Sequence, residues 1–564
     1  MARSSGKNGR FSRRDFIRGT AAAAASGTLL ARAARAAKPS DTPPGHTDAD
    51  IILQNGKVHT MDAQNRVVPT FAVKDGRFLS VGDAHPGPRT KVIDLQGRTV
   101  VPGIIDNHNH IVLMGNRPGY HTPLENAYSI ADVQVAYAAR AAAAPRNAWI
   151  TTIGGFHSNH FAEVRLPTLA ELDAAVPNNP VLLYIGFIGS AATNSAGKAI
   201  LQSANVDGFP VTVAENGAIA SGTQSTRALL YLRRTLLNFQ ERKRSALDAL
   251  AYGASVGVTT HLDQGAFQAS NTTADGAAHE DNYTMHLPFL ELYEEGKAMV
   301  RLRFNFLHME SDPNTPELAQ RLKNAFPFLG NDMVKTGAIG EFIAAGTGPT
   351  SPFVEAAKKV ARAGWRAEVH SLSAIDYQQE IQGFEAANAV APITDLRWVV
   401  AHAPFITQEY VNRLKALGGG ISLFGGSRYL TGTGVTNGPP YRMIVDSGIH
   451  AGMSCDGMQV APLNPWISMY YATTGTNALG LVINGAQRIT REEVLRLYTR
   501  ENGWFLREED QLGSIEEGRL ADLVVLNSDY FAVPDLELKK IRSVLTVVGG
   551  KVAYDGGVLD LTRG

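Results

Sequence analysis

Two histidines separated by one residue, His108 and His110, are the first side chains in the sequence with a clear chemical use. They follow the apolar, β-branched segment 99–105, which is typical of a buried strand. Residues i and i+2 of a strand point to the same side, so both imidazoles are expected to project together from its end. Two neutral imidazoles that converge in this way are ligands for a divalent metal ion such as zinc. The alternative is that they are two polar residues of a loop that follows the strand.

The sequence around these histidines resembles a known family. The segment Val101-Pro-Gly-Ile-Ile-Asp-Asn-His-Asn-His110 is similar to the first-strand signature of the amidohydrolase superfamily. Similar stretches extend from about Asp50 to Val552, and they most resemble amidohydrolase family 3, the branch that contains N-substituted formamide deformylase. The resemblance implies a metal-dependent hydrolase on a (β/α)8 barrel.

Further metal ligands are implied by the same resemblance. His370 and His402 each follow a short apolar segment and match the family's single histidines on strands five and six. Lys335 matches a lysine that is carboxylated in many members of the superfamily and then bridges two metal ions. Carboxylation turns a repelling ammonium group into an anionic oxygen ligand. The alternatives are an ordinary lysine that reaches solvent or pairs with Glu341, and Glu341 is the weaker candidate for the bridging position.

Asp456 follows the strand-like segment 449–455 and matches the family's catalytic aspartate. A carboxylate here can bind the metal and accept a proton from a water whose pKa the metal has lowered. The alternative role is that of a helix cap. His157 and His160, which follow the apolar segment 148–156, are the candidates for contact with substrate, although a solvated loop explains them equally well.

The pattern of segments predicts an α/β protein. Strand-like and helix-like segments alternate over residues 103–506, which predicts a parallel, TIM-like (β/α)8 barrel for the hydrolase domain. Active sites of such barrels lie at the carboxyl ends of the strands. Short β-branched segments fill residues 48–102 and 507–564. Because neither end has enough strands for a stable sheet, we expect both to pair in one small β-sandwich.

The amino-terminal residues predict export. Residues 1–36 contain Arg13-Arg14, an alanine-rich stretch and Ala-x-Ala sites, and they resemble a twin-arginine signal peptide. Residues 37–47 are interpreted as a linker. The implied partner is the twin-arginine export machinery, and the implied location is periplasmic or secreted. The only cysteine is Cys455, so no intramolecular disulfide is possible.

Composition excludes some other functions. The 53 basic and 53 acidic residues give a formal net charge of +0, which argues against nucleic acid as a partner. We therefore predict an exported, metal-dependent amidohydrolase that cleaves a C–N bond of a small amide, formamide or cyclic amide, with metal-activated water and Asp456 as general base and then acid. An esterase or lactonase is the alternative on the same site.

A secreted binding protein without turnover is a second alternative. It is motivated by three departures from the family pattern, at Gly189, Ile339 and Ala374. The sequence leaves open the substrate, the number of metal ions (one or two) and a homodimer like that of relatives.

Overall fold

The computed structural model of the protein describes residues 48–186, 189–266, 282–435 and 437–561. The predicted export signal (1–36) and linker (37–47) lie outside these residues. Among the described helices, none combines the length and the apolar character needed to cross a membrane.

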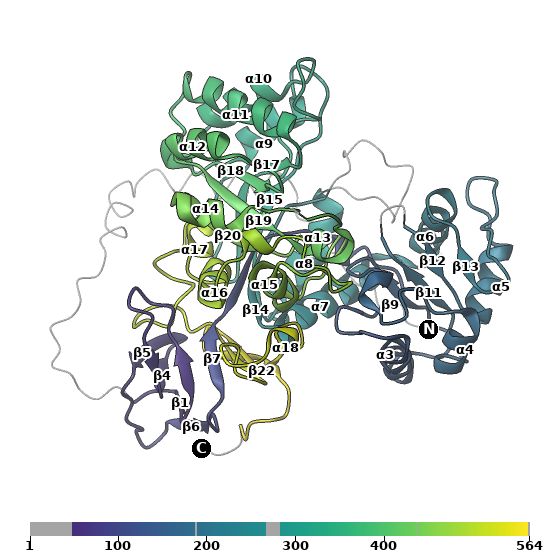
Figure 1. The fold of residues 1–564 in the computed structure, drawn as a ribbon, viewed down its shortest axis with the longest axis horizontal. Helices are drawn as coiled ribbons and strands as arrows, with labels where there is room; N and C mark the ends of the chain where they lie inside the picture. Colours follow the sequence, from purple (N-terminus) through teal and green to yellow (C-terminus); the bar gives the residue numbers. More distant parts are fainter. Residues whose placement is uncertain (1–47, 187–188, 267–281, 436, 562–564) are drawn as a thin grey trace, which may run out of the picture. The chain divides into compact units, whose positions relative to one another are not determined.

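Eight strands between residues 104 and 454 form two four-stranded sheets, and every pairing within both sheets is parallel. The first sheet has the order β16-β15-β14-β8 and the second the order β17-β18-β19-β20. Their bounds are β8 (Ile104–Asn109), β14 (Val258–Asp263), β15 (Arg301–Phe306), β16 (Val334–Ile339), β17 (Glu368–Ser371), β18 (Val399–His402), β19 (Gly420–Phe424) and β20 (His450–Ser454). Figure 1 labels β14 and β15 of the first sheet and all four strands of the second.

The two sheets meet at both of their outer edges. A parallel bridge between Ile339 and Ala367 connects β16 to β17. At the other edge, the Asp456 amide donates to the His108 carbonyl over 2.9 Å, and the His110 amide donates to the Gly457 carbonyl over 3.1 Å. The segments after β8 and β20 are therefore adjacent, although about 350 residues separate them in the sequence.

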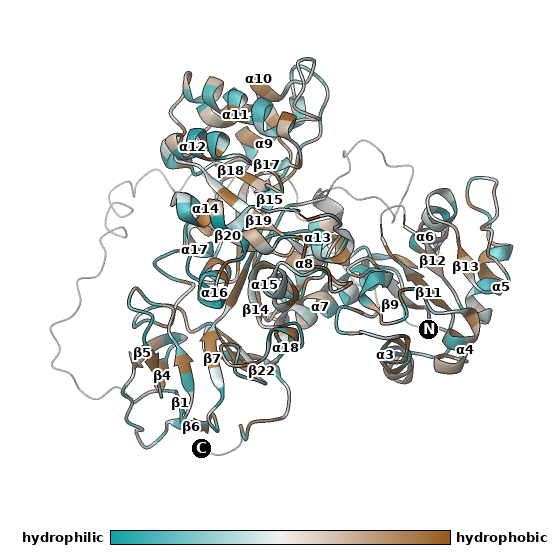
Figure 2. Cartoon of the chain, viewed as in Figure 1, coloured by the Kyte–Doolittle hydropathy of each residue, from teal (hydrophilic) through white to brown (hydrophobic). Residues whose placement is uncertain are grey.

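Helices pack against the strands through one large apolar core. Their bounds are α7 (Phe239–Ser255), α8 (Asn282–Glu294), α9 (Pro316–Asn324), α10 (Phe353–Arg362), α11 (Ala374–Asn388), α12 (Gln408–Ala416), α14 (Tyr441–Ser447), α15 (Pro465–Thr474) and α16 (Arg491–Tyr498). Helix α16 begins with a capping box between Thr490 and Glu493. On α12, hydrophilic and hydrophobic residues lie next to one another, as expected for a helix with one buried face (Figure 2).

A further five-stranded sheet lies between α2 (Ile111–Met114) and α7 in the sequence. Its order is β13-β12-β11-β10-β9, with bounds β9 (Tyr120–His121), β10 (Ile150–Ile153), β11 (Val181–Tyr184), β12 (Ala191–Ala192) and β13 (Ala218–Ile219). The barrel predicted for residues 103–506 includes the segments of β10 and β11. The structure instead pairs them with each other and with the short strands of this sheet. An apolar, β-branched segment predicts a buried strand but not the sheet that contains it.

Segments near both ends of the described residues share one sheet. A six-stranded sheet has the order β23-β22-β21-β7-β2-β3, and β7 (Thr99–Pro102) pairs with β21 (Leu523–Leu526) in antiparallel orientation. A four-stranded sheet, β5-β4-β1-β6, shares an apolar core with it. The other bounds are β1 (Ile51–Gln54), β2 (Lys57–His59), β3 (Val67–Val68), β4 (Phe71–Lys74), β5 (Arg77–Val81), β6 (Lys91–Asp94), β22 (Ser543–Val548) and β23 (Lys551–Asp555).

Candidate metal centre

Six polar side chains gather at the carboxyl ends of five of the eight parallel strands. Each belongs to the last residues of a strand or to the first residues after it, and this is the end at which α/β barrels carry their active sites. They are His108 and His110 at β8, Glu341 after β16, His370 on β17, His402 at the end of β18 and Asp456 after β20.

Glu341 is the centre of this cluster, and its side chain is 2% exposed. One carboxylate oxygen, Oε1, lies 3.1 Å from Nε2 of His110. The other, Oε2, lies 3.1 Å from Nε2 of His108 and 3.0 Å from Nδ1 of His370. His402 Nε2 is also 3.1 Å from Oε2. The cluster thus consists of two groups that share Glu341, one with the first histidine pair and one with the second.

Asp456 lies beside both groups. Its Oδ1 is 3.7 Å from His110 Nε2, and its Oδ2 is 3.9 Å from His402 Nδ1. His402 and Asp456 have positive φ angles of 68° and 47°, a region that non-glycine residues seldom adopt. Such backbone strain is typical of functional sites, where the surrounding structure maintains it. Asp456 is thus placed to exchange protons with a molecule bound between the histidines.

A second layer of groups orients the first two histidines. Nδ1 of His108 lies 2.6 Å from Oε1 of Glu368, and Arg366 Nη2 donates to the other oxygen of Glu368 over 2.6 Å. His110 Nδ1 lies 3.1 Å from the carbonyl oxygen of Gly265. In each imidazole the Nδ1 proton is therefore directed away from the cluster, and Nε2 faces Glu341.

Glu368 contacts this site but is not among the residues that the sequence predicted. It lies on β17 two residues before His370, so the two side chains share a face of the strand. The spacing that identified His108 and His110 would have identified this pair as well.

The charges in the cluster are strongly coupled. Burial disfavours the charged form of His108, but hydrogen bonds to Glu341 and Glu368 outweigh it and raise the pKa of this histidine well above its usual range. Burial alone would raise the pKa of Glu341, whereas the surrounding histidines, His370 and His110 above all, hold it well below its ordinary value. Glu341 therefore stays anionic in a buried place, which requires positive charge around it.

The donor set fits zinc. The two groups offer four imidazoles and the shared carboxylate of Glu341, which are ligand types that zinc prefers. Two ligands that bind one zinc ion through bonds of about 2.0–2.1 Å at tetrahedral angles are about 3.3 Å apart. The separations of 3.0 to 3.1 Å around Glu341 are close to this value.

Lys335 is not part of this cluster, contrary to the prediction that it is a carboxylated, bridging ligand. It is the second residue of β16, and its Nζ contacts Glu508, which also accepts from Arg303 Nε over 2.7 Å. Six residues separate Lys335 from Glu341, and this corresponds to about 20 Å along an extended strand. Glu341, the weaker candidate from the sequence, stands at the shared position.

The two histidines predicted to contact substrate lie outside the cluster. His160 is 4% exposed, and its ring lies between those of Tyr128 and Tyr429, at centroid distances of 4.7 and 5.5 Å. His157 accepts a hydrogen bond from the Asn159 amide and so caps the short 3-10 helix η2 (Ser158–His160). Cys455 is buried, which raises the pKa of its thiol and disfavours the reactive thiolate.

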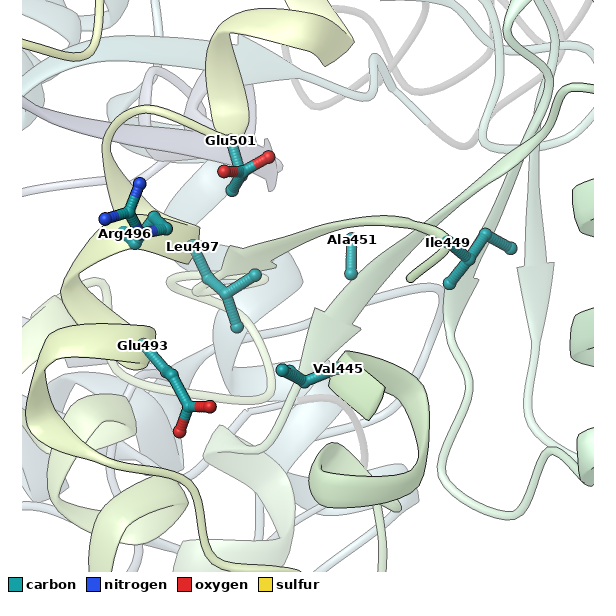
Figure 3. Close-up of a pocket in the computed structure, with 7 residues that line it drawn as sticks. All are labelled: Val445, Ile449, Ala451, Glu493, Arg496, Leu497 and Glu501. Carbon is teal, nitrogen blue, oxygen red and sulfur yellow. The ribbon is translucent and has the colours of Figure 1, made fainter. Parts of the chain in front are cut away.

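Two cavities lie near opposite ends of the parallel strands. One, of about 180 Å³, is lined by Ile449 and Ala451 at the amino end of β20 and by residues of α14 and α16 (Figure 3). It lies at the opposite end of β20 from Asp456. The other, of about 140 Å³, is lined by Glu341 and His370 and therefore adjoins the metal centre. Only the second is placed to hold a reacting molecule.

The site combines a shared carboxylate, two pairs of imidazoles and an adjacent aspartate at the ends of parallel strands. This combination defines the class of the protein, a metal-dependent hydrolase. The comparisons agree, because the model of the amidohydrolase family matches residues 91–554. The chain belongs to the amidohydrolase family, as its sequence predicts.

Relatives extend over nearly the whole chain. N-substituted formamide deformylase of Arthrobacter pascens is 23% identical over 557 residues, which cover 90% of this chain and 98% of that protein. A putative amidohydrolase of Bacillus subtilis is 22% identical over 550 residues, which cover 89% of this chain and 99% of that protein.

Solved structures show a similar fold. A metal-dependent hydrolase from Pyrococcus furiosus matches with a TM-score of 0.55 at 19% identity, covering 85% of this chain and 99% of that one. A variant of atrazine chlorohydrolase from Arthrobacter aurescens, crystallised with zinc and atraton, matches with a TM-score of 0.54 at 18% identity, covering 91% and 98%.

Proposed function

We propose that this protein holds two divalent metal ions, zinc in both cases, and hydrolyses a C–N bond of a small amide. His108, His110 and Glu341 would hold one ion, and Glu341, His370 and His402 the other. The position of Glu341, with one oxygen toward His110 and the other toward the remaining three histidines, is the observation that carries this proposal.

Bound metal ions would supply Lewis acidity, which lowers the pKa of a water molecule and polarises a carbonyl group. Asp456 accepts a proton from the attacking water while the oxygen of that water bonds to the carbonyl carbon of the substrate. The same carboxyl group then returns the proton to the nitrogen as the C–N bond breaks, so that an acid and an amine leave. Glu368 and the Gly265 carbonyl keep Nε2 of the two histidines directed at the centre throughout.

The substrate class follows from the relatives together with the site. A formamide deformylase matches over almost its full length, which supports an amide, formamide or cyclic amide as the substrate. The same residues could cleave an ester or lactone, so esters belong in the first activity screen.

The proposed architecture is a (β/α)8 barrel with a small β-sandwich. The contacts at both outer edges of the two parallel sheets support a closed ring of eight strands. The core shared by the four- and six-stranded sheets supports the sandwich. The boundaries are those expected from sequence, 48–102 and 507–564 for the sandwich and 103–506 for the barrel, with β9 to β13 as an insertion in the barrel.

Export remains a proposal that rests on sequence alone. Arg13 and Arg14 and the alanine-rich stretch after them support a twin-arginine signal. Cell fractionation of the full chain and of an Arg13→Lys/Arg14→Lys variant tests it. A periplasmic or secreted mature protein that becomes cytoplasmic in the variant is expected, and an unchanged distribution would contradict it.

The test of function is hydrolysis by purified protein with and without metal. The protein is stripped with a chelator, assayed on a panel of formamides, other amides, lactams and esters, and assayed again after addition of zinc. We expect hydrolysis of at least one amide that the chelator abolishes and zinc restores. A protein that binds no metal and cleaves no member of the panel would contradict the proposal and favour the alternative of a binding protein without turnover.

A further inference from the structure

The cavity beside the metal centre lies between the segments that follow β16 and β17. Its volume is about 140 Å³, and Glu341 and His370 belong to its lining. Six apolar side chains make up most of the remaining surface: Phe342, Ile343, Ala344, Phe353, Val369 and Leu372. Because two metal ligands line it, a group bound here is adjacent to the reacting bond.

No lysine or arginine lines this cavity. Asp376 also reaches it, but its Oδ2 accepts hydrogen bonds from the Leu372 and Ser373 amides at the start of α11. Glu380 is 1% exposed and accepts a hydrogen bond from the Ser371 hydroxyl. Burial raises the pKa of Glu380 well above its ordinary value, which favours the uncharged acid. Apart from the metal ligand His370 at its edge, the cavity lining therefore has no cationic side chain that could balance the charge of a bound carboxylate.

The volume limits what can enter. An apolar cavity of about 150 Å³ in another protein holds one benzene molecule, so this cavity has room for one phenyl ring or a branched alkyl group of similar size. Leu372 is 46% exposed and stands at the solvent side of the lining, whereas Phe353 and Val369 are each 2% exposed. Leu372 is thus placed to control the width of the entrance.

We propose that this cavity binds an uncharged, apolar substituent of the substrate, no larger than about one phenyl ring, and that Leu372 sets its size limit. The inference rests on the proposed hydrolase function and specifies its substrate class: neutral amides with a compact apolar group, rather than N-acyl amino acids. The substituent could be borne by the nitrogen or by the acyl carbon, and both arrangements place the same chemistry in the cavity.

The first experiment compares substrates on the zinc-loaded full chain. One series varies the nitrogen substituent of formamide (methyl, isopentyl, phenyl, 1-naphthyl), and a second varies the acyl group of a primary amide (acetyl, 3-methylbutanoyl, benzoyl). N-formylleucine is N-isopentylformamide with an added carboxylate. In the series that uses the cavity, we expect kcat/KM to rise at least about 10-fold from the smallest member to the phenyl or branched alkyl member. N-formylleucine should fall at least about 10-fold below N-isopentylformamide.

The second experiment changes the entrance. Leu372→Trp should lower the ratio of kcat/KM between the phenyl and methyl substrates at least about 10-fold, and Leu372→Ala should raise the ratio between the naphthyl and phenyl substrates. Opposite shifts from one position exclude general damage to the fold. Leu536→Trp is the matched control, because this leucine is 61% exposed on α18 (Asp535–Leu538), outside the cavity lining. It should leave both ratios unchanged.

Direct binding separates this inference from the proposed function. Fluorobenzene added to the metal-free protein, followed by fluorine NMR, should bind to wild type and to Leu536→Trp but not to Leu372→Trp. The cavity assignment would be overturned if the protein hydrolysed small amides without a size or charge preference and if the Leu372 variants left the ratios of kcat/KM unchanged. The proposed hydrolase function would still stand. Fluorobenzene binding without hydrolysis of any amide would overturn the function and retain the cavity as a binding site.

Discussion

Glu368 orients His108, and its replacement by glutamine tests whether the metal centre depends on this second layer. Its Oε1 lies 2.6 Å from His108 Nδ1 and its Oε2 2.6 Å from Arg366 Nη2. A glutamine amide has the same shape but only one accepting oxygen. Because His108 and Arg366 contact different oxygens of Glu368, a glutamine in the same position can accept from one of them but places its NH2 group against the other.

The expected effect has two parts. Loss of the group that orients a metal-binding histidine lowers metal affinity about 10–100-fold, which is about 1.4–2.7 kcal/mol. The side chains of Arg366 and Glu368 are both 0% exposed. Removal of one partner from a buried ion pair costs about 3–5 kcal/mol of folding free energy. Glu368→Gln should therefore bind zinc about 10–100-fold more weakly and should also be less stable.

Arg366→Met is the matched control. It breaks the same buried ion pair, but it leaves the Glu368 carboxylate bonded to His108 and to Gln264 Nε2, which is 3.1 Å away. Zinc affinity is measured by competition with a chromophoric chelator, and stability by urea unfolding of the metal-free proteins. We expect both variants to be destabilised but only Glu368→Gln to lose zinc affinity. Equal losses of affinity in the two variants would show that stability, and not the orientation of His108, explains the effect.

Three further predictions follow from individual side chains. Asp456→Asn should lower kcat about 10²–10⁴-fold while retaining zinc, because Asp456 lies outside both groups of ligands, and a metal analysis beside the kinetics checks this. Lys335→Met should keep its zinc but lose about 1–3 kcal/mol of stability through the broken pair with Glu508, whereas a carboxylated ligand would make the variant lose metal. Burial lowers the pKa of His160 to about 3. Below pH 6.5 the unfolded chain therefore binds a proton at this histidine that the folded protein does not bind, and the free energy of unfolding falls as the pH is lowered from 6.5 toward 3. Between pH 7 and 5 this lowers the free energy of unfolding by about 2 kcal/mol. His160→Phe keeps a ring between the two tyrosines, and urea unfolding should show that its stability falls about 2 kcal/mol less over this pH range than that of wild type. An unchanged pH dependence would contradict the prediction.

Much of the centre could be predicted from local sequence patterns. His108 and His110 share a strand face because they are two residues apart, and His370 and His402 lie at or near the carboxyl ends of short strands. Each of these signals lies within a few residues of the side chain it identifies. The pairing of the chain ends could also be predicted, because neither end alone has enough strands for a sheet.

The features that the sequence did not predict depend on distances along strands and on which strands pair in a sheet. Lys335 and Glu341 belong to the same strand-like segment, and only the position of the carboxyl end of β16 decides which one reaches the centre. The role of Glu368 requires contact with His108, a residue 260 positions away. Strands β10 and β11 have the composition of barrel strands, so composition could not assign them to a separate sheet.

The number of zinc ions per chain, measured by native mass spectrometry of wild type and of Glu341→Gln, tests the central claim most directly. Because Glu341 is shared by two groups of ligands, we expect two zinc ions in wild type and at most one in the variant. A wild-type protein without zinc, or a variant that retains two ions, would contradict the assignment of Glu341 as the shared ligand.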